Sequence, residues 1–125
     1  MSRTTINAPD VFRPSPAYSH AVRAGGLVFV SGTMAHGLDG QLVGETTQAQ
    51  TAQCLKNISA ILKAAGTSLD KAVCATVILA EEGDLPGVNE EWVKWFPVDP
   101  PARQGARLPI RVPGLKVSIA LIAEA

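Results

Sequence analysis

The sequence predicts an α+β fold in which two helices cover one face of a mixed β-sheet. Two helical segments interrupt a series of short β-prone runs, giving the predicted order β-β-β-α-β-α-β-β. The length of 125 residues fits one compact domain, so residues 1–125 are expected to form a single unit. Hydrophobic residues make up 46% of the chain, which is enough to build a buried core.

The predicted strands are short runs of β-branched and aliphatic residues. They cover residues 21–23, 27–30, 71–80, 102–110 and 115–123, with a further short edge strand near the N-terminus. Gly25 and Gly26 supply the turn of a hairpin between the first two of these strands. The run over residues 71–80 is continuously apolar, as expected for a strand that is covered on both faces. The glycine-rich residues 33–44 predict a loop.

Two segments carry apolar residues at helical spacing. Residues 47–66 form the clearer of the two, with Thr46 or Thr47 as the N-cap and a glycine as the stop. Residues 85–96 form the second, with Asp84 as its N-cap. These helices leave the other face of the sheet bare, and in so short a chain a further copy of the chain is the simplest cover.

Composition excludes several classes of function. Acidic and basic residues balance at 11 each, and the aromatic residues are few and scattered, so nucleic-acid binding is not expected. The N-terminus lacks the apolar segment of a signal peptide, and no apolar run reaches the ~18 residues of a membrane span. We therefore expect a soluble, cytoplasmic protein without membrane contacts. Cys54 and Cys74 form no metal-ligand pattern and are expected to be reduced, buried thiols.

Several short motifs occur in one order along the chain. They are Tyr18-Ser19 ahead of the hairpin, VFVSG (28–32), AAG followed by SLD, VN (88–89) before the aromatic-rich helix, PPAR (100–103) and LP (108–109). In this order the chain resembles the YjgF/Rid family, the reactive-intermediate deaminases, which are also known as endoribonuclease L-PSP-like proteins. The resemblance extends from about Pro14 to Ala123.

The resemblance implies a chorismate-mutase-like fold and a homotrimer, in which the sheets line a central β-barrel and clefts lie between subunits. It also implies a deaminase-type hydrolase that converts reactive enamines and imines to keto acids and ammonia. The expected partners are therefore a small carboxylated imine or enamine, or a keto acid, and further copies of the chain. No metal and no bound cofactor are expected.

The family pattern carries a site onto five positions of this chain. Arg103 corresponds to the arginine that holds the substrate carboxylate, a role that suits a permanent, two-pronged cation. Tyr18 corresponds to a tyrosine that packs against the substrate, and Ser31 with Gly32 brings backbone close to a ligand. Asn89 belongs to the VN motif and is expected to face the cleft. Each of these assignments has a structural alternative. Arg103 is then an ordinary salt-bridging arginine and Tyr18 a tyrosine between subunits. Ser31-Gly32 is then a plain strand end, and Asn89 a solvated asparagine.

Two positions depart from the family pattern. Active deaminases usually carry a cysteine two residues after the arginine, and here Gly105 occupies that position. They also carry a glutamate on the last strand, where Ser118 stands here. A serine hydroxyl orients water by hydrogen bonding but is no base at neutral pH. Arg107, in addition, makes the cleft more cationic. His36 in the glycine loop can titrate near neutrality, but a lone loop histidine is more often incidental, so the sequence supplies no clear replacement for the glutamate.

Four functions remain open on these residues. The first is imine or enamine deamination with an altered mechanism that uses Arg103 and Ser118. The second is a related enzyme of a catabolic or secondary-metabolite pathway with a shifted substrate. The third is a non-catalytic trimer that binds a small ligand, which the missing glutamate and cysteine favour. The fourth, ribonuclease activity, is disfavoured by the balanced charge.

Overall fold

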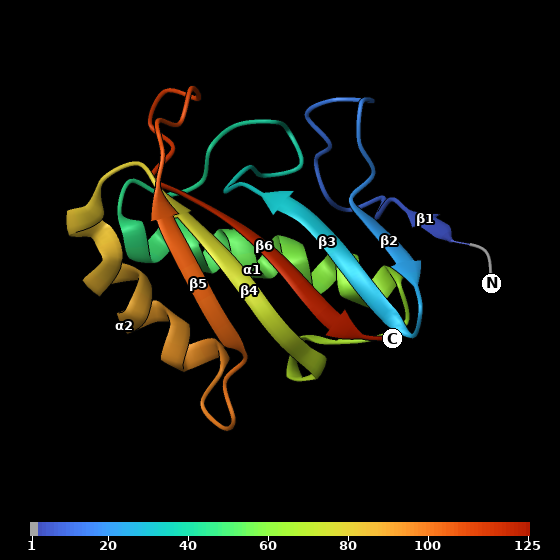
Figure 1. The fold of residues 1–125 in the computed structure, drawn as a ribbon. Helices are drawn as coiled ribbons and strands as arrows, with labels where there is room; N and C mark the ends of the chain where they lie inside the picture. The colour runs from blue at the N-terminus through green and yellow to red at the C-terminus, as the bar shows by residue number, and fades with distance from the viewer. Residues whose placement is uncertain (1–2) are drawn as a thin grey trace.

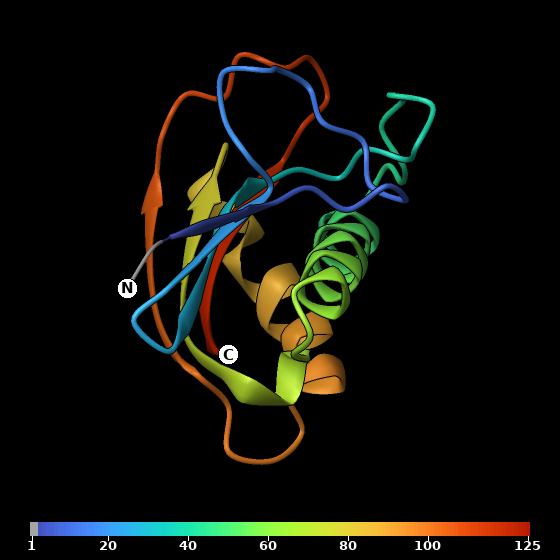
Figure 2. The ribbon, with the colours of Figure 1, turned by 90° about the vertical axis from the view of Figure 1, so that its right-hand side faces the viewer.

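The protein, described here from a computed structural model over residues 3–125, has two layers: a six-stranded sheet and a pair of helices on one of its faces (Figure 2). The helices are α1 (Thr47–Ala64) and α2 (Leu85–Trp95), and two 3₁₀ turns are η1 (Leu69–Lys71) and η2 (Glu82–Asp84). The strands are β1 (Thr4–Ile6), β2 (Ala21–Ala24), β3 (Leu27–Thr33), β4 (Ala72–Leu79), β5 (Ala102–Arg107) and β6 (Val117–Glu124). The predicted α+β class and element order are confirmed, including the short N-terminal edge strand.

The sheet is mixed, as predicted, and runs in the order β1-β2-β3-β6-β4-β5 (Figure 1). Among the strands of residues 3–125, only β4 and β5 are parallel, and α2 forms the crossover between them. β5 ends at Arg107, three residues earlier than the predicted strand over 102–110. The N–H of Leu108 still donates to the Leu79 carbonyl at 3.0 Å, but Pro109 has no N–H and cannot continue the ladder.

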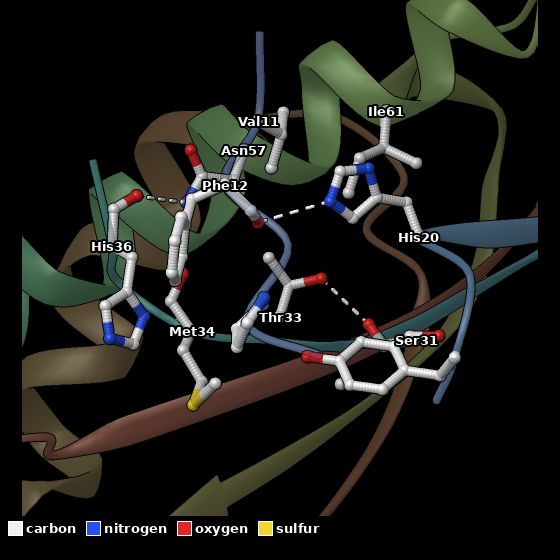
Figure 3. A pocket seen from close by; sticks show the side chains of 12 residues that line it. Val11, Phe12, His20, Ser31, Thr33, Met34, His36, Asn57 and Ile61 are labelled. Atoms are coloured by element: carbon white, nitrogen blue, oxygen red, sulfur yellow. Dashed lines mark hydrogen bonds between the residues drawn. The ribbon is translucent and has the colours of Figure 1, made fainter. Parts of the chain in front are cut away.

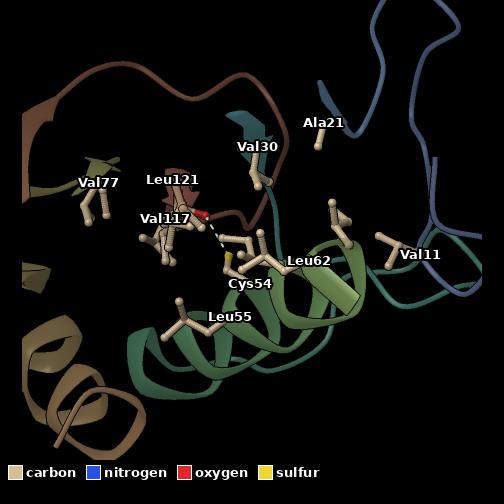
Figure 4. Packing of buried hydrophobic residues seen from close by; sticks show 14 of the residues in the cluster. Val11, Ala21, Val30, Cys54, Leu55, Leu62, Val77, Val117 and Leu121 are labelled. Carbon is tan, nitrogen blue, oxygen red and sulfur yellow. Dashed lines mark hydrogen bonds between the residues drawn. The ribbon is translucent and has the colours of Figure 1, made fainter. Parts of the chain in front are cut away.

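Helix α1 supplies most of the core. Thr46 caps it, because its side-chain oxygen accepts a hydrogen bond from the Ala49 N–H at 3.1 Å. Gly66 follows the helix with a φ of 85°, a left-handed conformation that suits glycine after a helix end. The buried stripe of α1 packs against β3 and β6 (Figure 4). Its apolar members are Cys54, Leu55, Ile58, Ile61 and Leu62.

Helix α2 begins differently from the prediction. Asp84 occupies the N-cap position, but its side chain makes no capping hydrogen bond. Its backbone is already helical, with φ −87° and ψ −5°, whereas a capping side chain needs the extended backbone that Thr46 has. Pro86 in the first turn also removes one of the N–H groups that need a cap. The helix is held by burial of Val88 and Trp92 instead.

The sheet face opposite the helices is open in the single chain. Along β4, Ala75, Val77 and Leu79 are buried under the helices, while the residues between them are half-buried, so the strand predicted to be covered on both faces is covered on one. Cys74 lies on the open face, and the prediction that it is buried was wrong. Cys54 is buried as predicted, and burial raises the pKa of its thiol to about 12. Neither helix within residues 3–125 is long and apolar enough to cross a membrane.

Candidate functional site

The arginine that the sequence singles out is held by helix α2. Arg103 lies beside Ala75 in the parallel β4–β5 ladder, so its side chain is on the helix-covered side of the sheet. One guanidinium nitrogen donates to Asn89 Oδ1 at 2.5 Å, and the guanidinium carbon lies 5.0 Å from the centre of the Trp92 ring. The hydrogen bond and the cation–π contact fix the orientation of the guanidinium before any ligand arrives, and they leave most of its N–H donors free.

Arg103 forms part of a groove of about 330 Å³ between β5 and the segment that leads into α2. The groove is lined by Val77, Leu79, Glu82, Leu85, Arg103, Gln104, Gly105, Ala106 and Arg107. Gly105 contributes only backbone to it. A Cβ atom there would lie 2.9 Å from the Val77 carbonyl oxygen, closer than real Cβ contacts, so the tight approach of β5 to β4 gives this glycine a structural reason.

A second group of predicted residues surrounds a small pocket near the end of β3 (Figure 3). Tyr18, Ser31 and Gly32 all line it, and its volume of about 20 Å³ is enough for one water molecule. Ser31 ties the Tyr18 loop to the strand, because its hydroxyl donates to the Ser19 carbonyl at 2.7 Å. Burial raises the pKa of the Tyr18 hydroxyl above its ordinary value of 10.0, and the Arg13 charge offsets only part of this rise. Tyr18 is therefore a neutral hydrogen-bond donor at physiological pH.

Gly32 and Ser118 are neighbours at an irregularity of the sheet. The register between β3 and β6 shifts between Val30 and Thr33, so Ser31 and Gly32 have no partner residue on β6. A Cβ atom at Gly32 would meet Ser118 Oγ at 3.4 Å. Backbone of β3 and the hydroxyl of β6 thus lie side by side, and within residues 3–125 the Ser118 hydroxyl has no hydrogen-bond partner.

The predicted site residues therefore form two groups, which the chain does not bring together. Arg103 and Gly105 align with Ala75 and Val77, which face the helices. Ser118 aligns with Ile78 and lies between the buried Val117 and Ile119, so its hydroxyl is on the open face. The sheet itself separates the arginine from the serine. A small ligand cannot contact both of them within one copy of the chain.

The two histidines lie near the second group but not in equivalent roles. His20 is buried: the Ala8 N–H donates to its Nδ1 at 2.9 Å, and its Nε2 bonds to the Phe12 carbonyl at 3.2 Å. These bonds require the neutral tautomer with the proton on Nε2. His36 lines the small pocket, and burial lowers its pKa below 6.5. No group of three or more His, Cys, Asp or Glu side chains within residues 3–125 could hold a metal ion.

One residue of the first group was not singled out as functional from the sequence. Trp92 has the spacing of a core residue of α2, and it is indeed 5% exposed. Its ring nevertheless lies under the Arg103 guanidinium. The available signal was its position three residues after Asn89, which places both side chains on one face of the helix.

Comparisons with known proteins agree with this fold and this sequence. The family model described as "Endoribonuclease L-PSP" matches residues 5–125. Over 96% of its length the chain is 40% identical to "Reactive Intermediate Deaminase A, chloroplastic" of Arabidopsis thaliana, and the match spans 63% of that relative. It is 37% identical over 96% of its length to the mouse "2-iminobutanoate/2-iminopropanoate deaminase", 87% of which is covered.

Among solved structures, the chain is similar to RidA from the Antarctic bacterium Psychrobacter sp. PAMC 21119. The TM-score is 0.90 at 31% sequence identity, and the match covers 98% of this chain and 99% of the other. A match over nearly the whole chain, by family model, by sequence and by structure, identifies the family. The chain belongs to the endoribonuclease L-PSP family, also called the YjgF/Rid family.

Proposed function

We propose that the protein hydrolyses reactive 2-imino acids, or their enamine tautomers, to 2-keto acids and ammonium. The observation that carries this proposal is the exposed Arg103 guanidinium, oriented by Asn89 and Trp92 at the edge of a groove of small-molecule size. The two parallel N–H donors of a guanidinium group match the two oxygens of a carboxylate, the group that all 2-imino acids share. The names of the mouse and Arabidopsis relatives, which refer to iminobutanoate, iminopropanoate and reactive intermediates, support the same reaction.

The complete site, in this proposal, lies between two copies of the chain in a homotrimer. Arg103 comes from one copy, and Gly32 with Ser118 comes from its neighbour, because the sheet separates these residues within one copy. Two surfaces of the single chain support association. All six residues of edge strand β5 are exposed, and the open sheet face carries Phe29, which is 42% exposed. Apolar groups on an unpaired sheet are normally covered by a partner.

The reaction needs few groups because a protonated imine is already electrophilic. Arg103 holds the carboxylate, and the Gly32 backbone with the Ser118 hydroxyl orients a water molecule toward C2. The water oxygen bonds to C2, its protons pass to the amino nitrogen, and the C2–N bond breaks to release the keto acid and ammonium. Ser118 acts by hydrogen bonding alone, since a neutral hydroxyl is too weak a base to remove a proton.

Two alternative functions stay in view. The absence of the usual glutamate and cysteine, at Ser118 and Gly105, favours a trimer that binds keto acids or related ligands without turnover. The second cation in the groove, Arg107, favours an enzyme with a shifted, more anionic substrate. Turnover of a 2-imino acid, measured as acceleration over its spontaneous hydrolysis, contradicts the first alternative. Binding of a keto acid without any such acceleration supports it.

A complementation experiment tests the shared site. Arg103→Ala removes the clamp, and we expect kcat/KM to fall about 100-fold from loss of a charged hydrogen-bonded pair. Gly32→Val places a side chain against Ser118 Oγ and is expected to inactivate the other half. Neither Arg103 nor Gly32 is itself a member of the buried core. Co-expression of the two gives mixed trimers in which some sites combine two intact halves, about one quarter if mixing is random.

Recovery of about that fraction of wild-type activity supports a site between copies. Activity of the mixture that stays as low as that of each variant alone contradicts it. An Arg103→Ala variant with wild-type kcat/KM contradicts the clamp itself. Sedimentation of the wild-type protein checks the trimer independently, and a monomer at micromolar concentration contradicts it.

A further inference from the structure

A second arginine shares the groove with Arg103. Arg107 is the last residue of β5 and pairs with Leu79, so its side chain is on the same side of the strand as that of Arg103. It is exposed, and within residues 3–125 its guanidinium makes no hydrogen bond or ion pair. Arg103 is held by α2, whereas Arg107 is free to meet a ligand. The β5 side of the groove therefore carries two guanidinium groups, one fixed by contacts with α2 and one without such contacts.

The floor between the two arginines is open. Gly105 stands midway between them and has no side chain, and Val77 and Leu79 supply apolar walls. Four residues of extended strand separate the two Cα atoms by about 13 Å. If both side chains extend in parallel from the strand, their guanidinium carbons are spaced like the Cα atoms and leave about 5 Å between two carboxylate carbons, because each bidentate pair takes up about 4 Å. An extended five-carbon dicarboxylate has about this distance between its terminal carbons.

Glu82 is the acidic residue of the groove lining and opposes anion binding there. It lies in η2, just beyond the end of β4 and hence near the Arg107 end of the groove. One carboxylate against two guanidinium groups leaves the groove net cationic. The Glu82 carboxylate repels a ligand carboxylate bound at Arg107, so a neutral residue at position 82 should strengthen binding.

We infer that Arg107 forms a subsite for a second carboxylate, and that the preferred substrate is a five-carbon 2-imino dicarboxylate, the imine of a glutamate-type amino acid. This inference rests on the proposed function, since it assumes that Arg103 holds the 2-imino carboxylate. The distal carboxylate then lies at Arg107, and the carbon chain passes over Gly105. An imine with an apolar side chain fills the first subsite and leaves the second empty.

The test compares two substrates and their two products. The imines of glutamate and of alanine are generated in place by amino-acid oxidases, and kcat/KM is measured for each above the spontaneous rate. In parallel, calorimetry measures Kd for the five-carbon 2-keto dicarboxylate and for pyruvate. We expect the wild-type protein to prefer the dicarboxylate in both assays. Arg107→Gln should reduce this preference about tenfold, and Glu82→Gln should increase it.

Arg111→Gln is the matched control, since Arg111 is exposed but does not line the groove. It should leave the preference unchanged. Equal or weaker handling of the dicarboxylate by the wild-type protein overturns the inference, as does a preference that Arg107→Gln leaves intact. The two assays separate the proposed function from the Arg107 subsite. Dicarboxylate binding that depends on Arg107 supports the subsite even without turnover. Turnover of the alanine imine alone supports the proposed function and overturns the subsite.

Discussion

The two halves of the candidate site differ in charge and in whether side chains or backbone form them. The half on β5 and α2 is cationic and made of side chains: Arg103 is oriented by Asn89 and by the Trp92 ring. The half on β3 and β6 is neutral and made largely of backbone, with Gly32 at a register shift beside the hydroxyl of Ser118. The difference indicates that recognition of an anion and activation of water can change separately. In the proposed function, the cationic half is a strong binding half and the neutral half is a weak water-activating half.

Strengthening the water-activating half should raise activity, and this gain should exceed the effect of loosening the binding half at Asn89 or of changing the pH. Ser118→Glu places a carboxylate beside Gly32, where it can accept a proton from the attacking water. General bases contribute substantially to such reactions, and we expect kcat for a 2-imino acid to rise about tenfold. The rise should disappear below the pKa of the new carboxylate, so kcat measured against pH shows an acid limb that the wild-type protein lacks.

Ser118→Gln is the control, because it has nearly the same size and cannot act as a base. If the Gln and Glu variants have the same kcat and the same pH profile, water activation at this position is not what limits the reaction. A loss of activity in both variants, with the fold retained by circular dichroism, indicates that the cleft has no room for a longer side chain.

The sequence predicted the fold well because each element has a local cause. Thr46 before a helical stripe and the Gly25-Gly26 turn each act within a few residues, and both are present as expected. Two of the errors also have local causes, and the third depends on a neighbour in space. Asp84 does not cap α2 because its own backbone is already helical, and β5 stops early because of Pro109. Whether β4 is covered on both sides depends on the sheet face opposite the helices, which a single chain leaves open.

The site was harder to predict for a related reason. Motif order identified Arg103, Asn89 and Gly32, but order along the chain does not specify the face of a sheet on which a residue lies. That Arg103 and Ser118 are on opposite faces follows only from the register of β4 with both of its neighbours. Gly105 illustrates the same limit: the sequence indicates a missing cysteine, whereas the structure adds a close approach to the Val77 carbonyl.

A smaller effect is expected from loosening the binding half. Asn89→Ala removes the hydrogen bond that orients Arg103, and we expect KM to rise about three- to fivefold with kcat little changed. Asn89→Asp should raise KM further, because its carboxylate pairs with Arg103 and competes with the substrate. Asn89 and Arg103 are both exposed, so neither Asn89 variant should lower the melting temperature appreciably. An unchanged KM in both variants contradicts a positioning role for Asn89.

The smallest effect should come from pH, and it should act on the neutral half alone. Burial lowers the pKa of His20 below 6.5, Arg13 adds to this, and the bond to the Phe12 carbonyl opposes it. Protonation at Nδ1 breaks the hydrogen bond from Ala8 and loosens the segment that carries Tyr18. Because the folded pKa is depressed, the stabilisation is complete above pH 6.5 and is lost as pH falls through the lower, folded value.

The melting temperature should therefore decrease between pH 7 and pH 5, and the Tyr18 segment should exchange its amide hydrogens faster, while the α2–β5 half keeps its protection. The pKa of His36 is also lowered by burial, so His36→Asn is the necessary control and should retain most of the pH dependence. His20→Asn should remove it at the cost of a lower stability at pH 7. If the pH dependence instead follows His36, the neutral half is held by contacts other than the His20 bonds to Ala8 and Phe12.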